Sequence, residues 1–348
     1  MKVIRTISLL PIVAFAISCG GSSGGSGGGN VGMHTAQEVV ANAAFPTALR
    51  FSPGGDLIYI EKSTGNVRKV ANGSLQPTPV FTTSVNSGGE RGMLGLAVDP
   101  DYATNQFLYL LYTKPSGVEA EIVRIVDGAG AGQTPTAIVP SLPAASIHNG
   151  GRIEFGPDGK LYVTIGDVGD PANAQSDSSL AGKVLRYNPD GSIPNDNPIN
   201  GNPIFSKGHR NAFGMAIHNS GTVFVSENGP NCDDEVNRLT PNGNFGWRPG
   251  QPCGDSDPSY LTPLKRFSNV IAPTGMAIGT GRYSGGLLMG SFNDSKLRWM
   301  TLDSFPGGSL AGITDIIDLG DEAVIDVTIG PDGNPYVATS SRILRLVP

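Results

Sequence analysis

The sequence predicts an all-β fold, a six-bladed β-propeller of four-stranded antiparallel blades. The composition favours strands and turns, because the 348 residues include 49 glycines and 27 prolines and show few long helical patterns. One turn-and-strand unit recurs six times, with starts roughly 45 to 65 residues apart, which is the spacing of propeller blades. A large β-sandwich is the alternative, but a sandwich needs no repeated turn of this kind.

Each copy of the repeat combines a tight turn with a buried strand. In the clearest copy, residues 155–163 read Phe-Gly-Pro-Asp-Gly-Lys-Leu-Tyr-Val. Proline fixes φ, aspartate accepts hydrogen bonds from nearby backbone and glycine tolerates positive φ, so Pro-Asp-Gly predicts the turn. The apolar residues that follow predict a strand, and a second strand-like segment comes after each copy, as at 183–187. The six copies cover residues 51–60, 98–110, 155–163, 217–225, 283–289 and 329–337.

The N-terminal segment predicts export. A basic start precedes an apolar run at 7–17, which is typical of a signal peptide and too short to span a bilayer comfortably. Small residues lead into Cys19, so we expect a lipoprotein signal peptide at 1–18 and a lipid on Cys19, with a plain signal peptide as the alternative. Residues 19–33 are then a Gly/Ser-rich linker to a propeller at 34–348. The chain is expected to be a bacterial lipoprotein, periplasmic or anchored at the outer membrane or cell surface.

The remaining cysteines predict a disulfide, and the net charge limits the partners that the chain is expected to bind. In an exported protein Cys232 and Cys253 are expected to form a disulfide, with two free thiols as the alternative. The formal net charge is −6, and no basic run is present. An acidic chain of this kind is a poor partner for nucleic acid, and we expect membrane contact only through the lipid on Cys19.

Four glycine-rich segments with polar or charged side chains are the candidate functional loops. Glycine lets backbone approach a ligand closely, and propeller ligands bind at one mouth of the central channel. A single histidine in such a loop is usually structural, but four similar loops favour a site. The segments are residues 88–92, 148–152, 208–211 and 226–230.

Through these segments the chain resembles the soluble dehydrogenases of glucose, aldoses and sorbosone that depend on pyrroloquinoline quinone. The resemblance extends from about residue 44 to the C-terminus, and it implies the six-bladed propeller that the repeats already predict. The matching stretches are residues 88–102, 148–167, 181–186, 191–198, 208–215, 227–237 and 244–247.

The resemblance implies roles for three side chains. His148 matches the general base that takes the hydroxyl proton of the sugar, and imidazole is suited to this because it titrates near neutral pH. Arg210 matches the cation beside the quinone carbonyl, where negative charge develops. Asn211 matches a polar contact of the cofactor.

The resemblance also implies a calcium ion that touches the cofactor. The backbone carbonyls of Gly229 and Pro230 match its ligands, and Glu227 in the same segment is a further candidate ligand. Oxygen ligands suit a hard cation, which could polarise a quinone.

Five positions depart from the pattern of the family. Glu90, the candidate cofactor contact before the second repeat, stands in place of a glutamine, and Phe213 replaces another glutamine. Asn293 occupies the position of a cofactor-binding lysine, and Ala323 and Ile325 occupy those of two arginines. Each lost charge-assisted hydrogen bond is worth about 1.5–3 kcal/mol, so quinone affinity is expected to fall by several powers of ten.

Nearby cations could offset part of this loss. Arg91 could neutralise Glu90, and Lys296 and Arg298 could replace the charge missing at position 293. On a strand, however, their side chains could face away from the channel.

Three functions are therefore compatible with the sequence. The first is an exported sugar or alcohol dehydrogenase that uses the quinone, with an electron acceptor that the sequence does not name. The second is a non-catalytic propeller that binds a carbohydrate or a protein after losing the cofactor clamp. The third is a calcium-dependent hydrolase or lactonase with Glu227, Asp233 and Asp234 as ligands, although Asp233 and Asp234 could simply cap turns.

Overall fold

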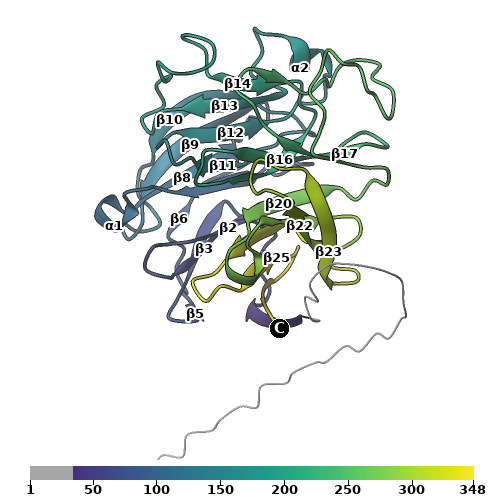
Figure 1. The fold of residues 1–348 in the computed structure, drawn as a ribbon. Helices are drawn as coiled ribbons and strands as arrows, with labels where there is room; N and C mark the ends of the chain where they lie inside the picture. Colours follow the sequence, from purple (N-terminus) through teal and green to yellow (C-terminus); the bar gives the residue numbers. More distant parts are fainter. Residues whose placement is uncertain (1–33) are drawn as a thin grey trace, which may run out of the picture.

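The computed structural model describes residues 34–348 and folds them into six small β-sheets arranged around a common axis (Figure 1). This confirms the predicted all-β fold and the six blades. The signal peptide predicted at 1–18, the lipidated Cys19 and the linker at 19–33 lie outside the described residues.

We number the blades by the chain order of their innermost strands. Blade 1 contains β2 (Pro46–Phe51), β3 (Leu57–Glu61), β4 (Asn66–Ala71), β5 (Ser74–Leu75) and β6 (Phe81–Thr82). Blade 2 contains β7 (Met93–Val98), β8 (Phe107–Thr113), β9 (Glu119–Val126) and β10 (Thr136–Pro143). Blade 3 contains β11 (Ile153–Phe155), β12 (Leu161–Ile165), β13 (Lys183–Tyr187), β14 (Ile204–Lys207) and β18 (Gly243–Asn244).

The other three blades follow the same plan. Blade 4 contains β15 (Ala212–Ile217), β16 (Val223–Glu227), β17 (Asp234–Arg238) and β19 (Lys265–Phe267). Blade 5 contains β20 (Pro273–Ile278), β21 (Gly286–Ser291), β22 (Lys296–Leu302) and β23 (Leu310–Asp318). Blade 6 contains β24 (Asp326–Ile329), β25 (Pro335–Ala338), β26 (Ile343–Val347) and β1 (Thr35–Val40). The short helices are α1 (Tyr102–Asn105), α2 (Ala172–Gln175) and the 3₁₀ helix η1 (Gly281–Tyr283).

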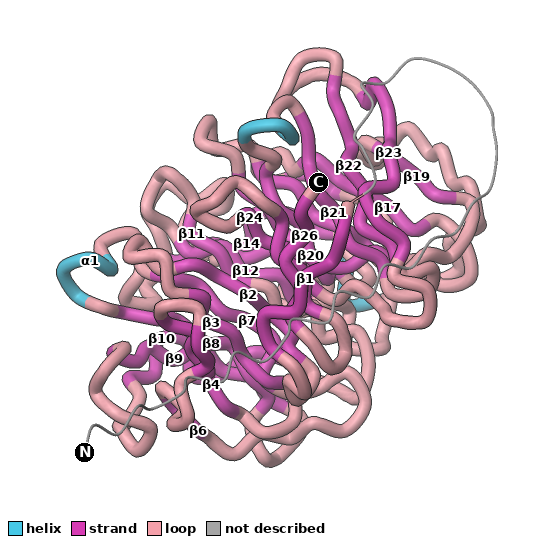
Figure 2. Tube along the Cα trace, turned by 90° about the horizontal axis from the view of Figure 1, so that it is seen from below, coloured by secondary structure: helices cyan, strands magenta, loops and turns pink. Residues whose placement is uncertain are grey.

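Two details differ from six identical four-stranded antiparallel blades. Blades 1 and 3 each gain a fifth strand, and the extra strand of blade 3, β18, pairs with β14 in parallel. Blade 6 takes its outer strand from the other end of the chain, because β1 pairs with β26 (Figure 2). This pairing joins both ends of the propeller, which closes the ring.

The ring of blades is closed on its inside as well. The innermost strands β2, β7, β11, β15, β20 and β24 each lie against the next, and β24 lies against β2. In the region from 34 to 348, the buried apolar side chains form six clusters, one between each pair of neighbouring blades.

The strands read as continuous apolar runs because both of their faces are buried. In β3, Leu57 and Tyr59 point into the cluster shared with blade 6, whereas Ile58 and Ile60 point into the cluster shared with blade 2. Alternate side chains of a strand face opposite sides of its sheet, so a strand in the middle of a blade needs apolar residues at every position.

All six sequence repeats fall on the same hairpin, the one between the first and second strands of a blade. In blade 3, Gly159 has a φ of 70° and the Asp158 carboxylate accepts from the backbone N–H of Lys160 at 3.1 Å. The same carboxylate accepts from the Tyr162 hydroxyl at 2.9 Å and from the Arg186 guanidinium at 2.9 Å. The repeated aspartate therefore caps the turn and also fastens it to the next two strands.

Arg152 lies at the centre of the ring and connects its blades. It directly precedes β11, is 2% exposed, and donates to the carbonyl of Thr47 and to those of Leu94 at 2.9 Å and Ile325 at 3.2 Å. The Phe213 ring of blade 4 lies 4.7 Å from its guanidinium carbon. One buried cation from blade 3 thus joins blades 1, 2, 4 and 6.

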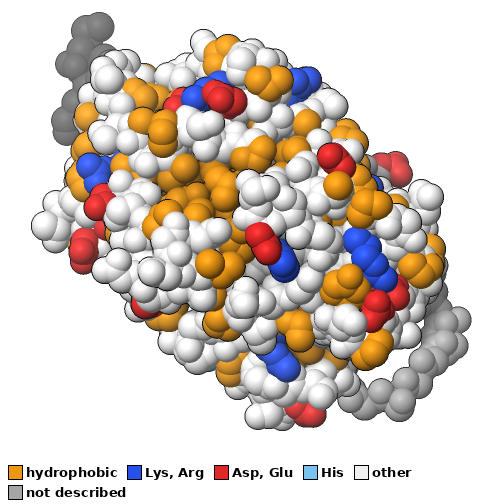
Figure 3. All heavy atoms as spheres, turned by 90° about the horizontal axis from the view of Figure 1, so that it is seen from above, with side chains coloured by type: hydrophobic (Ala, Val, Ile, Leu, Met, Phe, Trp, Pro, Cys, Tyr) orange, Lys and Arg blue, Asp and Glu red, His pale blue; other side chains and the backbone are white. Residues whose placement is uncertain are grey.

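The surface seen in Figure 3 carries few charges. Its Lys, Arg, Asp and Glu side chains stand singly or in small groups of mixed sign, and apolar side chains gather across the middle of the face. Across residues 34–348, no helix has the length and apolar character needed to cross a membrane.

Candidate active site

The candidate loops meet at one mouth of the channel. The segments before the innermost strands and those after the second strands lie at the same end of each blade, because neighbouring strands run antiparallel. The six repeat turns lie at the opposite end. The segments around His148 and Arg210 precede β11 and β15, and the segment around Gly229 follows β16, so all three belong to the same mouth.

His148 is held in an unusual backbone conformation with its ring against a carboxylate. Its φ is 55°, and Gly150 and Gly151 that follow also have positive φ values of 61° and 95°. Non-glycine residues rarely adopt this region, and such conformations cluster at functional sites. The ring Nδ1 lies 2.6 Å from Oδ1 of Asp167, and the His148 side chain is 13% exposed.

Asp167 is a site residue that the sequence motifs do not indicate by themselves. Its side chain is completely buried and comes just after β12. Besides the His148 ring, it accepts from the backbone N–H of Gly169 at 2.8 Å and from the indole N–H of Trp247 at 2.7 Å. A carboxylate oxygen accepts hydrogen bonds, so the ring nitrogen that faces it must be the donor. The imidazole therefore carries its proton on Nδ1 and keeps the lone pair on Nε2. The sequence signal was an acidic residue directly after a buried strand.

Arg210 lies beside this pair on the segment before β15. Its backbone N–H donates to Glu227, and its guanidinium donates to the carbonyl of Asn228 at 2.8 Å. The guanidinium carbon lies 5.5 Å from the centre of the Trp247 ring. Burial lowers the pKa of Arg210, an effect opposed by nearby carboxylates, Asp167 first among them.

One atom of Arg210 lacks a partner. Within the described region its buried Nε makes no hydrogen bond to protein. A buried charged donor without an acceptor is costly, so this N–H is suited to an oxygen of a ligand.

Gly166 shows how closely the His148 and Arg210 segments approach each other. A Cβ on this glycine would lie 2.2 Å from the carbonyl oxygen of His148 and 2.9 Å from that of Arg210. The next residue, Asp167, donates its backbone N–H to the same Arg210 carbonyl at 2.7 Å. Both segments therefore pack against the turn after β12, which brings the imidazole and the guanidinium to one place.

Glu90 and Asn211 tie three loops of the mouth together. A single carboxylate oxygen of Glu90 accepts from the backbone N–H of His148 at 2.7 Å and from the amide of Asn211 at 3.1 Å. The amide oxygen of Asn211 accepts in turn from the N–H of Gly150 at 3.1 Å. Arg91 donates instead to the carbonyls of Gly88 and Gly117, so the expectation that Arg91 neutralises Glu90 is wrong.

Hydrogen bonds hold the predicted calcium segment in place. The N–H of Gly229 donates to the Asp234 carboxylate at 2.8 Å, which fixes the backbone next to Pro230. The two oxygens of Glu227 accept from the His209 ring at 2.9 Å and from the N–H of Arg210. Both oxygens of Glu227 are therefore engaged in holding the segment around Arg210. The carbonyls of Gly229 and Pro230 are the better candidates for ion ligands.

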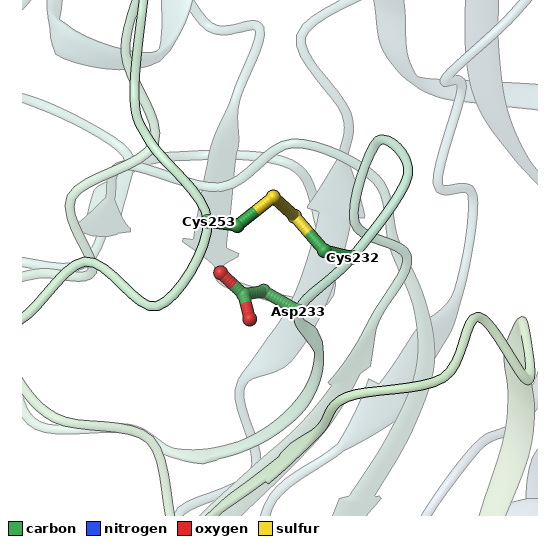
Figure 4. A group of neighbouring side chains, drawn as sticks. All are labelled: Cys232, Asp233 and Cys253. Atoms are coloured by element: carbon green, nitrogen blue, oxygen red, sulfur yellow. A yellow bond between two sulfur atoms is a disulfide. The ribbon is translucent and has the colours of Figure 1, made fainter.

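The bridge between Cys232 and Cys253 forms as expected, with their Cα atoms 6.0 Å apart (Figure 4). The carboxylate of Asp233 lies beside it and accepts from the N–H of Gly254 at 2.5 Å. In the described part of the chain, these three side chains are the one group of three His, Cys, Asp or Glu close enough to share a metal ion. Both sulfurs are bonded to each other and cannot bind as thiolates, so this group holds a loop together.

The five departures from the family pattern lie in three places, and one of them, Glu90, lies at the mouth against His148 and Asn211. Phe213, Ala323 and Ile325 belong to the same apolar cluster between blades 6 and 1. Asn293 lies on the exposed segment after β21, where its amide donates to the carbonyl of Val270 at 3.1 Å.

The two cations near Asn293 are engaged elsewhere. Lys296 pairs with Asp315 at 2.6 Å, and Arg298 pairs with Asp294 and donates to the Ser291 hydroxyl at 2.7 Å. The expectation that they replace the missing lysine is therefore not supported.

Two hollows show where a ligand could fit. The one beside Arg210, Trp247 and Gln251 has room for about 30 Å³, which is enough for a water molecule and too small for a sugar. A larger one of about 460 Å³ is lined by Asp158, Arg186 and others at the repeat-turn end, away from His148. Neither hollow is lined by His148, so a sugar that reaches the His148 ring would have to lie outside both of them.

Comparison with known proteins agrees with the geometry. A profile of the family described as Glucose / Sorbosone dehydrogenase matches residues 43–347. Quinoprotein glucose dehydrogenase B of Acinetobacter calcoaceticus is 33% identical over 244 residues, which cover 60% of this chain and 51% of that protein. The chain thus spans about half the length of this relative.

Solved structures match over nearly the whole described region. A protein from Thermus thermophilus, described as a putative oxidoreductase (glucose dehydrogenase), superposes with a TM-score of 0.82 at 33% identity, covering 90% of this chain and 100% of that one. The PQQ-bound aldose sugar dehydrogenase of Streptomyces coelicolor superposes with a TM-score of 0.79 at 30% identity, covering 90% of this chain and 98% of that one.

Proposed function

Because the chain belongs to the glucose / sorbosone dehydrogenase family, we propose that it oxidises a sugar or related alcohol with His148 as the general base. The observation that carries the proposal is the 2.6 Å contact between the His148 ring and Asp167, with Arg210 packed against the same turn. This arrangement offers a proton acceptor and a cation side by side.

His148 takes the proton of the substrate hydroxyl on Nε2. Asp167 holds the Nδ1–H, so the lone pair of Nε2 faces away from the carboxylate and is available for the substrate. As the ring becomes cationic, the buried Asp167 carboxylate stabilises it.

Arg210 stabilises negative charge that develops opposite His148. Its guanidinium is partly desolvated and is fixed by the Asn228 carbonyl and the Trp247 ring, so it needs little rearrangement during the reaction. Its Nε, which has no protein partner in the described structure, is the atom best placed to donate.

The residues fit the reactive end of pyrroloquinoline quinone, which is bound in the Streptomyces coelicolor aldose sugar dehydrogenase. Arg210 and Asn211 would hold the cofactor there, and the bound quinone would supply the carbonyl that accepts hydride. Binding of the carboxylate end of the quinone is expected to be weaker, because Asn293, Ala323 and Ile325 offer no charge. We expect binding with lower affinity than a site with cations at these positions would give.

We further propose that calcium binds at the carbonyls of Gly229 and Pro230. The Asp234 hydrogen bond to Gly229 supports this, since a loop held in this way presents its carbonyl oxygens with less further ordering. We also retain the proposal that the protein is an exported lipoprotein anchored through Cys19.

The test is reconstitution of the purified protein with the quinone and calcium. Dye reduction is followed with a panel of aldoses and alcohols, and quinone binding is titrated in parallel. His148→Ala should lower the rate by about 10²–10⁴-fold, the usual contribution of a general base. His218→Ala is the matched control, because His218 lies on a repeat turn at the other end and contacts Ser220.

The outcomes separate the candidate functions. Full activity in His148→Ala would refute the assigned base. Absence of quinone binding at high micromolar concentration would favour the non-catalytic propeller. Hydrolysis of a lactone that requires calcium would favour the third function, although Asp233 and Asp234 each hold a loop in this structure.

A further inference from the structure

We propose that Trp247 is a positioning residue that orients Asp167 and Arg210 together, and the His148 ring through Asp167. This inference rests on the proposed function and adds a residue to it. Trp247 lies on the long connection between β18 and β19, about 80 residues away from Asp167 in sequence, so no local motif joins them.

The backbone of Trp247 is fixed between the two segments that it would align. Its N–H donates to the carbonyl of Gly208, two residues before Arg210, at 3.0 Å. Its carbonyl accepts from the side chain of Gln175 at 2.8 Å, on the segment that follows Asp167. The backbone of Trp247 is therefore held by the segment before Arg210 and by the segment after Asp167, and this fixes the place from which the indole extends.

The indole N–H determines how the Asp167 carboxylate is turned. It donates to Oδ2 at 2.7 Å, while Oδ1 faces the His148 ring at 2.6 Å. The Asp167 side chain is completely buried, so water does not compete for these oxygens. Without the indole N–H, one oxygen would lose its donor and the carboxylate could rotate away from the imidazole.

The ring face of Trp247 supports Arg210. The guanidinium carbon lies 5.5 Å from the ring centre, within the range of a cation–π contact. The same guanidinium also donates from a terminal nitrogen to the Asn228 carbonyl at 2.8 Å. The Trp247 side chain thus uses its edge for Asp167 and its face for Arg210.

A purely structural role explains Trp247 less well. In the region from 34 to 348 it belongs to none of the six apolar clusters between blades, whereas Trp299, the other tryptophan of the chain, packs against the cluster between blades 5 and 6. Trp299 also donates its indole N–H, to the carbonyl of Tyr283 at 2.9 Å. It is therefore a control with the same chemistry at a distant place.

The first test needs neither cofactor nor activity. With ¹⁵N-labelled histidine, the ring nitrogens of His148 report which of them carries the proton, and His148→Ala identifies the signal. Wild-type protein and Trp299→Phe should show the Nδ1–H tautomer. Trp247→Phe keeps a ring over Arg210 but removes the N–H, so the population of the Nδ1–H tautomer should fall.

The second test is kinetic. Trp247→Phe should lower kcat roughly 10- to 100-fold, as expected when a reacting group is misplaced by a fraction of an ångström. KM for the sugar should change by less than about threefold, because the substrate does not depend on Asp167 for binding. Trp247→Leu also removes the support of Arg210 and should lower kcat further, while circular dichroism checks that each variant is folded.

The results are decisive in either direction. An unchanged tautomer in Trp247→Phe, or the same kcat as Trp299→Phe, would overturn the inference even if the enzyme is active. A wild-type protein without dehydrogenase activity would refute the proposed function, but the tautomer comparison would still decide whether Trp247 orients the pair.

Discussion

Replacing Arg152 should destabilise the whole ring, because one guanidinium serves carbonyls of three other blades. In Arg152→Met the carbonyls of Thr47 and Leu94 lose their donor in a place that is closed to water, whereas the Ile325 carbonyl keeps the backbone N–H of Gly275 at 3.1 Å. Each buried acceptor left without a partner costs about 1–3 kcal/mol, which gives about 2–6 kcal/mol for these two carbonyls. Asp326, 3.5 Å from the guanidinium, also loses one of its cations, so the upper half of this range is expected.

The assay is equilibrium unfolding in urea, followed by circular dichroism. A loss of this size is a large part of the roughly 5–15 kcal/mol that stabilises a typical protein. Arg345→Met is the control, since Arg345 pairs with Asp332 on the surface and is 30% exposed, which limits its contribution to about 1 kcal/mol. Arg152→Lys keeps the positive charge but not the forked guanidinium, so its loss of unfolding free energy should lie between those of Arg345→Met and Arg152→Met. A loss below about 1 kcal/mol in Arg152→Met would refute the reasoning.

Three further predictions concern a disulfide, a buried lysine and a close backbone contact. Reducing the bridge between Cys232 and Cys253 should lower the free energy of unfolding by about 3 kcal/mol, measured as a shifted urea midpoint; an unchanged midpoint would contradict it. Lys183→Met should cost at least about 2 kcal/mol and speed amide exchange around α2, because this buried ammonium donates to three backbone carbonyls. Gly166→Ala should lower kcat about tenfold or more by displacing His148, whose carbonyl a Cβ would meet at 2.2 Å, and wild-type rates would count against it.

Local chemistry was enough to predict the blades from the sequence. The Pro-Asp-Gly turn needs only residues that are neighbours in the chain, and the structure uses Asp158 and Gly159 as the turn requires. The doubly buried strands are likewise visible as apolar runs. The role of β1 was not visible, because its partner β26 lies at the other end of the chain and nothing in residues 35–40 specifies it.

The candidate site could be predicted only as a set of loops. The sequence placed His148 and Arg210 at one mouth, but the pairs that orient them connect distant segments, as Trp247 does with Asp167. The direction in which each side chain points also could not be predicted from the sequence. Arg91 points toward Gly88 and Gly117, and Lys296 toward Asp315, so neither lends its charge where proximity in the sequence suggested it.

The departures at 213, 323 and 325 belong together physically. Phe213 packs against the cluster that contains Ala323 and Ile325, and its ring also covers the buried guanidinium of Arg152. An arginine placed at 325, which is 1% exposed, would bring a further cation close to Arg152, whose partner Asp326 is already shared with Arg50. A single reversion would therefore cost stability before it could help to bind an anion. The apolar cluster and Arg152 beneath the Phe213 ring therefore form one packed arrangement, and under the proposed function positions 213, 323 and 325 would offer no charge to the carboxylates of a cofactor.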